Sequence, residues 1–305
     1  MLKKVLKKYW ILLSIIFVIL IPTLILTTVR TNYDAYVPGS IESVGSVVEI
    51  DSNNKSDNYY STSVYYIDRI TLFQKLIFSN INEGLVYKRS KNMTTEKDRL
   101  QGEIEHNSAI YTSLISAYKE ANIELDYKHI GIYVYDTTSN VLNIGDVVLG
   151  SNYDDCVSIL KSDEVKILRN NQETTVKLNS GDKVALAYPY YEINNDKIKV
   201  YPSNNGGPSA GLMQALKLYD DLVDENLATK YKVGGTGTID SDGNAGAIGC
   251  VGLKIYTAIY NNVDIFFIPN ENKEEAEKYL KKIKTNMKIV YVSTLSEAIN
   301  YLRGV

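Results

Sequence analysis

Two side chains in the last third of the sequence have the chemistry needed for nucleophilic catalysis. Ser209 lies in the glycine-flanked run 207–211, and Lys254 follows the glycine-containing run 249–253. A serine hydroxyl is a poor nucleophile unless a neighbouring base accepts its proton. Both histidines of the chain precede residue 130, so lysine is the base that this part of the sequence offers. We therefore predict a serine nucleophile paired with a lysine base.

The neighbours of Ser209 suit that role. Gly207 lets the backbone approach a substrate closely, and Pro208 is favoured at the start of a helix. Ser209 is then predicted at a helix N-terminus, where unpaired N–H groups and the helix dipole favour developing negative charge. Backbone N–H groups around Gly207 and Ser209 are accordingly expected to hold the oxyanion, and Gly207 and Pro208 are our candidates for shaping that site.

Lys254 must be neutral in order to accept a proton. Its apolar neighbours Ile248, Val251, Leu253 and Ile255 predict that it is buried, and burial lowers the pKa of a lysine. A shift from ~10.4 to about 7–8 costs about 3–5 kcal/mol, at ~1.36 kcal/mol per pKa unit. The packing of the fold has to offset that cost.

Each motif alone has a simpler interpretation. A Gly-Pro-Ser-Ala-Gly turn is commonly a loop that enters a helix, and a lysine in a glycine-rich turn is commonly solvated. The run 234–237 is similar to a phosphate-binding loop, but it lies within a strand pattern and is not followed by Lys-Ser. The ordered set of motifs is therefore more informative than any one of them.

Composition argues against several other classes of protein. The 305-residue chain has a net charge of −3, which gives no indication of nucleic-acid binding. Its two cysteines, Cys156 and Cys250, are too few for a disulfide framework and lack metal-ligand spacing. The sequence contains no HExxH pattern and no Walker A pattern. We therefore expect no metal, no ATP and no other cofactor.

The N-terminal region has the pattern of a membrane anchor. Four lysines between residues 3 and 8 precede an almost unbroken apolar run, Trp10–Val29, which is long enough to cross about 30 Å of hydrocarbon as a helix. The basic cluster predicts a cytoplasmic N-terminus and an exported body. A cleaved signal peptide is the alternative, but the run is long and residues 28–32 offer no small-x-small site. We assign residues 1–35 to a basic tail and single-pass anchor in the cell membrane.

Residues 36–126 have the pattern of a strand and helical segment. Strands are expected up to Ile50 and at 61–66, and apolar residues at helical spacing over Ile67–Ile77 predict a short helix. Its apolar face could pack on the body or lie on the membrane, and we expect packing because the helix lacks a basic face. A longer helix, with Thr95 and Asp98 as a capping pair, is expected to end near residue 122.

Residues 127–181 are rich in strand patterns. A Gly-Asp pair precedes apolar β-branched residues, and a strand ending in Arg, a polar turn and a last strand follow. This order resembles a PDZ domain. The gap over residues 152–164 is too short for the long helix that walls one side of a PDZ groove. A purely structural module and one that binds peptides by strand addition both remain open.

From residue 182 to 305 strands and helices alternate, which predicts a sheet covered by helices. The order of motifs here resembles the Lon peptidase domain over residues 183–303. The run 207–211 matches the segment that carries the catalytic serine, and the run 248–254 matches the segment that carries the catalytic lysine. The runs 236–239 and 267–272 match two strands of that family.

This resemblance implies a serine–lysine dyad of Ser209 and Lys254, with Thr236 as a candidate to orient the lysine. Gly206 stands where the ATP-dependent Lon enzymes have Asp, and Cys250 occupies a position that is often glycine. We interpret Cys250 as a packing residue. The complete order of segments is similar to the membrane-anchored, PDZ-containing Lon-like proteases of Gram-positive bacteria (the YlbL type), whose serine motif also lacks the Asp.

The fold class expected is an α+β multidomain chain: transmembrane helix, helical and β insert, truncated PDZ-like β module and C-terminal Lon-type α/β proteolytic domain. The function expected is an ATP-independent serine endopeptidase outside the cell that cleaves exported peptides and flexible or unfolded proteins. The alternative is a catalytically weak or inactive, membrane-tethered peptide-binding or scaffold protein. Lon-type domains often form rings, which implies a homo-oligomer.

Overall fold

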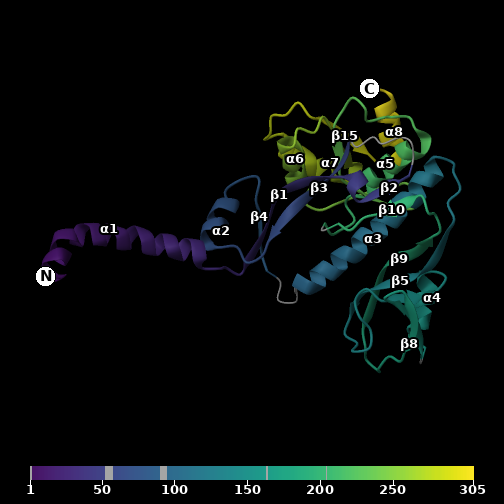
Figure 1. The fold of residues 1–305 in the computed structure, drawn as a ribbon, viewed down its shortest axis with the longest axis horizontal. Helices are drawn as coiled ribbons and strands as arrows, with labels where there is room; N and C mark the ends of the chain where they lie inside the picture. Colours follow the sequence, from purple (N-terminus) through teal and green to yellow (C-terminus); the bar gives the residue numbers. More distant parts are fainter. Residues whose placement is uncertain (1, 52–57, 90–94, 163, 204) are drawn as a thin grey trace.

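The computed structural model describes residues 2–51, 58–89, 95–162, 164–203 and 205–305. A long N-terminal helix projects from a body that contains two larger β-sheets (Figure 1). The helix α1 spans Leu2–Thr28. Its segment Lys8–Thr28 is long and apolar enough to cross a membrane, and a signal sequence would share both properties. None of that segment is buried against the body.

The main sheet has six strands in the order β15-β14-β11-β3-β1-β4. The central strand β11 runs parallel to β3 and β14, whereas β1 runs antiparallel to β3 and β4. The strands are β1 (Tyr33–Ser43), β3 (Tyr59–Ile67), β4 (Leu85–Lys88), β11 (Val233–Gly235), β14 (Ile265–Pro269) and β15 (Lys288–Val292). Segments from both ends of the chain therefore build one sheet.

Helices cover both faces of this sheet. Alternate side chains of β14 point to opposite faces, so Phe267 packs with α5 and α8 while Phe266 packs with α6 and α7. A further long helix, α3, packs against α5. The helices are α3 (Thr95–Glu120), α5 (Gly211–Val223), α6 (Val251–Tyr260), α7 (Lys273–Leu280) and α8 (Leu295–Arg303).

The second larger sheet has five strands in the order β8-β7-β6-β5-β9, with all neighbours antiparallel. The elements are β5 (Tyr127–Thr137), β6 (Val147–Leu149), the short helix α4 (Tyr153–Ile159), β7 (Val165–Arg169), β8 (Gln172–Val176) and β9 (Val184–Ile193). Buried Val148, Ile167 and Cys156 form its own small core. The first half of α3 connects this sheet to the main body through an ion pair. Nζ of Lys97 on α3 lies 2.7 Å from Oδ2 of Asp136 on β5.

Four short strands of two or three residues form two further strand pairs. The strand β2 (Val48–Ile50) pairs with β10 (Ile198–Val200), and β12 (Thr238–Ile239) pairs with β13 (Ala245–Gly246). The strand pattern that includes residues 234–237 is divided in the structure into β11 and β12, and Thr236 lies at the break. The break lets the chain turn away from the sheet at the point where the site forms.

Three features differ from the expectations. The segment 36–126 supplies β1 and β3 to the main sheet and is no separate insert. The strand β9, expected in the C-terminal α/β domain, pairs with β5. The short helix α2 (Leu72–Phe78) buries none of its residues, so the expectation that its apolar face packs on the body is wrong. The side chain of Thr95, expected as a cap, lies outside the described residues.

Strand β3 is linked to α5 by a buried hydrogen bond, because the Tyr59 hydroxyl donates to Oδ2 of Asp220 at 2.8 Å. Tyr59→Phe leaves this buried carboxylate with one donor fewer. We expect the free energy of unfolding to fall by about 1–3 kcal/mol in urea denaturation. Tyr65→Phe, at an exposed position of the same strand, is the control and should change it by less than about 0.5 kcal/mol. If the two substitutions lowered the free energy of unfolding equally, the result would contradict a stabilising hydrogen bond between β3 and α5.

Candidate active site

The loop before α5 holds Ser209 two residues ahead of the helix. The Ser209 carbonyl accepts hydrogen bonds from the Gly237 N–H at 2.8 Å and from the Thr236 hydroxyl at 3.1 Å. The Leu212 N–H donates to the Gly237 carbonyl at 3.0 Å. Hydrogen bonds in both directions therefore join the break after β11 to the start of α5. The backbone of the serine is therefore fixed by the main sheet.

Gly211 explains why the serine motif ends in glycine. A Cβ atom at this position would lie 2.9 Å from the Ile239 side chain and 3.1 Å from its backbone nitrogen. A larger residue would push the start of α5 away from β12. The glycine thus permits the close approach of helix and strand that positions Ser209.

The lysine comes from the opposite face of the sheet. Lys254 lies in the first turns of α6, and its Nζ atom is 2.6 Å from Oγ of Ser209. Nζ also donates to Oγ1 of Thr236 at 3.0 Å. The three side chains meet at the carboxyl end of β11, where open α/β sheets commonly place their ligand sites. The structure therefore brings together the serine, the lysine and the threonine that the sequence singled out.

Thr236 has a definite hydrogen-bonding arrangement. Its hydroxyl hydrogen is directed at the Ser209 carbonyl, so the oxygen lone pairs face Nζ of Lys254. The amine therefore uses a hydrogen to bind Thr236. In the neutral amine, this arrangement leaves the nitrogen lone pair for the hydroxyl of Ser209. Thr236 itself is fully buried, which keeps water out of the contact.

Burial controls the charge of the amine. Lys254 is only 4% exposed, and desolvation lowers its pKa from 10.5 to about 8. Within the described part of the chain, no carboxylate forms an ion pair with Nζ. A substantial fraction of the amine is therefore neutral near pH 8. The shift agrees with the direction expected from its apolar sequence neighbours.

Cys250 precedes α6 in a left-handed conformation, with φ of 58°. This conformation favours glycine, which explains why glycine would suit the position. Burial raises the pKa of its thiol, so the sulfur is held as the unreactive neutral form. The structure is consistent with our interpretation of Cys250 as a packing residue.

The two oxyanion candidates differ from the expectation. The Gly207 N–H donates to the Gly102 carbonyl on α3 at 2.9 Å, and Pro208 has no N–H to offer. Both residues therefore shape the loop and do not present a donor. The N–H groups of Ser209 and Ala210 bond to no other residue among those the structure describes.

Gly102 is a site residue that the sequence reasoning missed. A Cβ atom on Gly102 would lie 3.4 Å from Cα of Gly206, so α3 and the serine loop approach each other through two glycines. The available signal was a glycine inside a long helical pattern, which lowers helix stability unless packing requires it. A helix far upstream of the catalytic motifs thus shapes the loop before Ser209.

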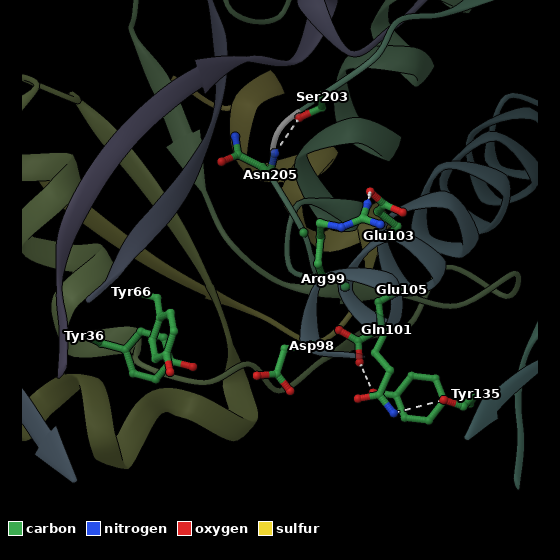
Figure 2. A pocket seen from close by; sticks show the side chains of 13 residues that line it. Tyr36, Tyr66, Asp98, Arg99, Gln101, Glu103, Glu105, Tyr135, Ser203 and Asn205 are labelled. Carbon is green, nitrogen blue, oxygen red and sulfur yellow. Dashed lines mark hydrogen bonds and ion pairs between the residues drawn. The ribbon is translucent and has the colours of Figure 1, made fainter. Parts of the chain in front are cut away.

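A cleft of about 720 Å³ opens beside this loop (Figure 2). Its walls come from β1, β3, the first half of α3, β5 and the loop that contains Asn205. The Glu105 carboxylate accepts a hydrogen bond from the Tyr135 hydroxyl at 2.6 Å, and Gln101 donates to the Tyr135 carbonyl at 2.9 Å. The cleft therefore lies between the main body and the second sheet, and it reaches Gly207.

The described residues give no sign of a metal centre. Within the described ranges, no group of three or more His, Cys, Asp or Glu side chains is placed to hold an ion.

Comparison with known proteins gives a family match in the C-terminal part of the chain. Residues 196–303 match the family model of the Lon protease (S16) C-terminal proteolytic domain. The chain carries a Lon proteolytic domain. The match covers less than half of the chain, and it includes Ser209, Thr236 and Lys254. The presence of this domain supports serine protease activity.

Curated relatives match over the same part of the chain. Lon protease 2 of Borreliella burgdorferi is 28% identical over 96 residues, which are 32% of this chain. The Lon proteases of Aster yellows witches'-broom phytoplasma and Neorickettsia sennetsu are 32% and 28% identical over 31% and 32% of the chain. Each alignment spans only 12% of the relative's own length.

The buried amine should lower the stability of the Lon domain near neutral pH. Because folding lowers the pKa of Lys254 from 10.5 to about 8, the folded chain holds the charged form at a cost below pH 8. Lys254→Met should raise the free energy of unfolding at pH 7 by about 3 kcal/mol, at ~1.36 kcal/mol per pKa unit.

The sign of the pH dependence provides the control. Between pH 8 and 10.5 the unfolded chain binds more protons at this lysine, so the stability of the native protein rises with pH. The advantage of Lys254→Met should therefore shrink across that interval. Urea denaturation of both proteins at several pH values measures it, and a constant advantage would contradict a depressed pKa.

Proposed function

We propose that the protein is a serine endopeptidase that works with a Ser209–Lys254 dyad and needs no ATP. The observation that carries this proposal is the 2.6 Å contact between Oγ of Ser209 and the buried Nζ of Lys254. A neutral amine at this distance is a suitable general base. Thr236 holds Nζ in place through the 3.0 Å hydrogen bond.

In the first chemical step, Oγ of Ser209 attacks the peptide carbonyl carbon while its proton moves to Nζ of Lys254. The resulting ammonium then gives a proton to the leaving amine as the C–N bond breaks, which leaves an acyl ester on Ser209. Water then attacks the ester carbon while Lys254 takes a proton from it. The C–O bond to Ser209 breaks, the ammonium returns the proton to Oγ of Ser209, and the product leaves as a carboxylic acid. The amine therefore serves as base and acid in turn.

The oxyanion needs donors close to Ser209. The Gly207 N–H is engaged by Gly102, so we assign this role to the N–H groups of Ser209 and Ala210, which precede α5. A helix N-terminus beside them adds favourable dipole potential. This assignment replaces the earlier candidate Gly207, which remains important for the shape of the loop.

We propose the cleft beside residues 205–207 as the binding site for substrate. It lies between two sheets and opens to solvent, so an extended or flexible polypeptide segment could occupy it. A folded protein would have to unfold first, and we expect such proteins to be poor substrates. The second sheet, which we interpret as a trimmed PDZ-like module, would form one side of this entrance.

We propose that α1 anchors the protein in the cell membrane, with its N-terminus in the cytoplasm and the Lon domain outside. The four lysines near the N-terminus and the exposed apolar segment Lys8–Thr28 support this orientation. Exported and cell-surface polypeptides would then be the available substrates. Assembly into a homo-oligomer is part of the same proposal, because Lon-type domains often form rings.

Substitutions at the dyad test the proposal. In the full chain, Ser209→Ala and Lys254→Ala should each lower kcat/KM on an unstructured peptide about a thousandfold or more. Thr236→Val should lower it by up to about a hundredfold, because the amine loses a positioning contact. Ser162→Ala and Lys230→Ala, at exposed positions away from the site, are matched controls. If the native chain cleaves no faster than Ser209→Ala, with or without ATP, the inactive scaffold is the better description.

The dependence on pH provides a second test. Lys254 is an effective base only when neutral, and its pKa is lowered to about 8. We expect kcat/KM to rise nearly tenfold per pH unit below this value and to level off above it. Measured rates that stay constant from roughly pH 6 to 9 would exclude a titrating lysine as the base.

A further inference from the structure

The helix α2 exposes a continuous apolar face. Leu72, Phe73, Leu76 and Ile77 are spaced so that they share one side of the helix, and each is exposed to solvent. Leu76 is 60% exposed and Phe73 is 44% exposed. A capping box at Thr71 makes this a well-defined helix even though none of its residues is buried. An ordered helix with its apolar side uncovered indicates a surface that is covered in the working protein.

The position of α2 is fixed relative to the end of α1. The Leu72 N–H donates to the Val29 carbonyl at 3.2 Å, and the Thr31 N–H donates to the Ile70 carbonyl at 2.9 Å. Arg30 and Thr71 form an isolated β-bridge between these two bonds. Figure 1 shows α2 beside the end of α1 and running across its direction. A helix in this place lies along a membrane that α1 crosses.

We propose that α2 is a membrane-surface helix, with its apolar face in the boundary between lipid headgroups and acyl chains. This inference rests on the proposed role of α1 as a membrane span. Helix α1 ends at Thr28, and the first residue of α2, Leu72, is hydrogen-bonded to Val29, so both helices would meet the same bilayer surface. Exposed Arg30 and Arg69 lie at this junction, which favours anionic lipid headgroups.

A second copy of the chain fits this face less well. A stable interface buries about 800 Å² on each partner. The seven residues of α2 are only about 10 Å long, at 1.5 Å per residue. Because α2 is hydrogen-bonded to Val29, which directly follows α1, lipid is favoured over protein as the surface that covers the apolar face of α2.

Docking of α2 on the membrane would also determine where the cleft lies relative to the bilayer. Strand β1 begins at Tyr33, close to the end of α1, and Tyr36 lines the cleft about 10 Å further along the strand. The part of the cleft that Tyr36 and Tyr66 line would then lie close to the membrane surface. Polypeptide segments near the bilayer would consequently reach the site most readily.

Tryptophan fluorescence in lipid vesicles tests the docking. The full chain has one tryptophan, Trp10, in the proposed span. We would place Phe73→Trp and, as a matched control, Tyr153→Trp into separate Trp10→Phe chains. Tyr153 is 53% exposed and lies on α4, the short helix of the second sheet. All proteins are reconstituted in phosphatidylcholine and phosphatidylglycerol vesicles with lipids brominated near the headgroup end of the acyl chain or at its middle.

We expect bromine to quench the Phe73→Trp probe several times more strongly than the Tyr153→Trp probe, and most strongly near the headgroup. Adding Leu76→Gln and Ile77→Gln, both exposed, should weaken that quenching. If Trp10 is quenched but Phe73→Trp is quenched no more than Tyr153→Trp, α2 docking is overturned while the anchor stands. A blue-shifted Phe73→Trp emission without quenching would overturn it in favour of a second copy. An unquenched Trp10 would overturn the anchor and the docking together, without bearing on the dyad.

Discussion

The site depends on one lysine amine that is kept out of water beside a serine hydroxyl. Desolvation makes Lys254 a base near neutral pH and also makes the folded chain less stable. Helices on both faces of the main sheet offset that cost, since α5 brings Ser209 from one side and α6 brings Lys254 from the other. The break after β11 lets the two helices meet through Thr236.

Strands far upstream in the chain also help to position Lys254. Helix α6 is held by Thr257, whose hydroxyl lies 3.2 Å from the Ser63 carbonyl on β3 and accepts from the Gly39 N–H on β1 at 2.9 Å. Thr257 is one helical turn beyond Lys254, so these contacts help to fix the position of the Lys254 amine relative to the sheet. Strands β1 and β3 thus carry part of the active-site geometry although they contribute no catalytic side chain.

The order of motifs indicated which side chains meet at the site better than it indicated their surroundings. It singled out Ser209, Thr236 and Lys254, and the structure places these three side chains in contact. The partner of β9 could not be identified, since apolar alternation is the same whichever sheet a strand joins. The exposure of α2 also escaped prediction, because helical spacing of apolar residues suits a core and a membrane surface alike. Gly207 was misjudged because its N–H is bound by a helix that sequence spacing does not place nearby.

Helix α3 joins the separate parts of the molecule into one arrangement. Its Gly102 carbonyl holds the serine loop, while Glu105 binds Tyr135 of the second sheet. A displacement of the second sheet would therefore act on a helix that contacts the loop two residues before Ser209. Because β1 follows α1 in the chain and lines the cleft opposite α3, the two walls of the cleft are carried by different elements. Helix α3 also packs on α5, the helix that follows Ser209, so one wall of the cleft and the position of Ser209 depend on the same packing contact.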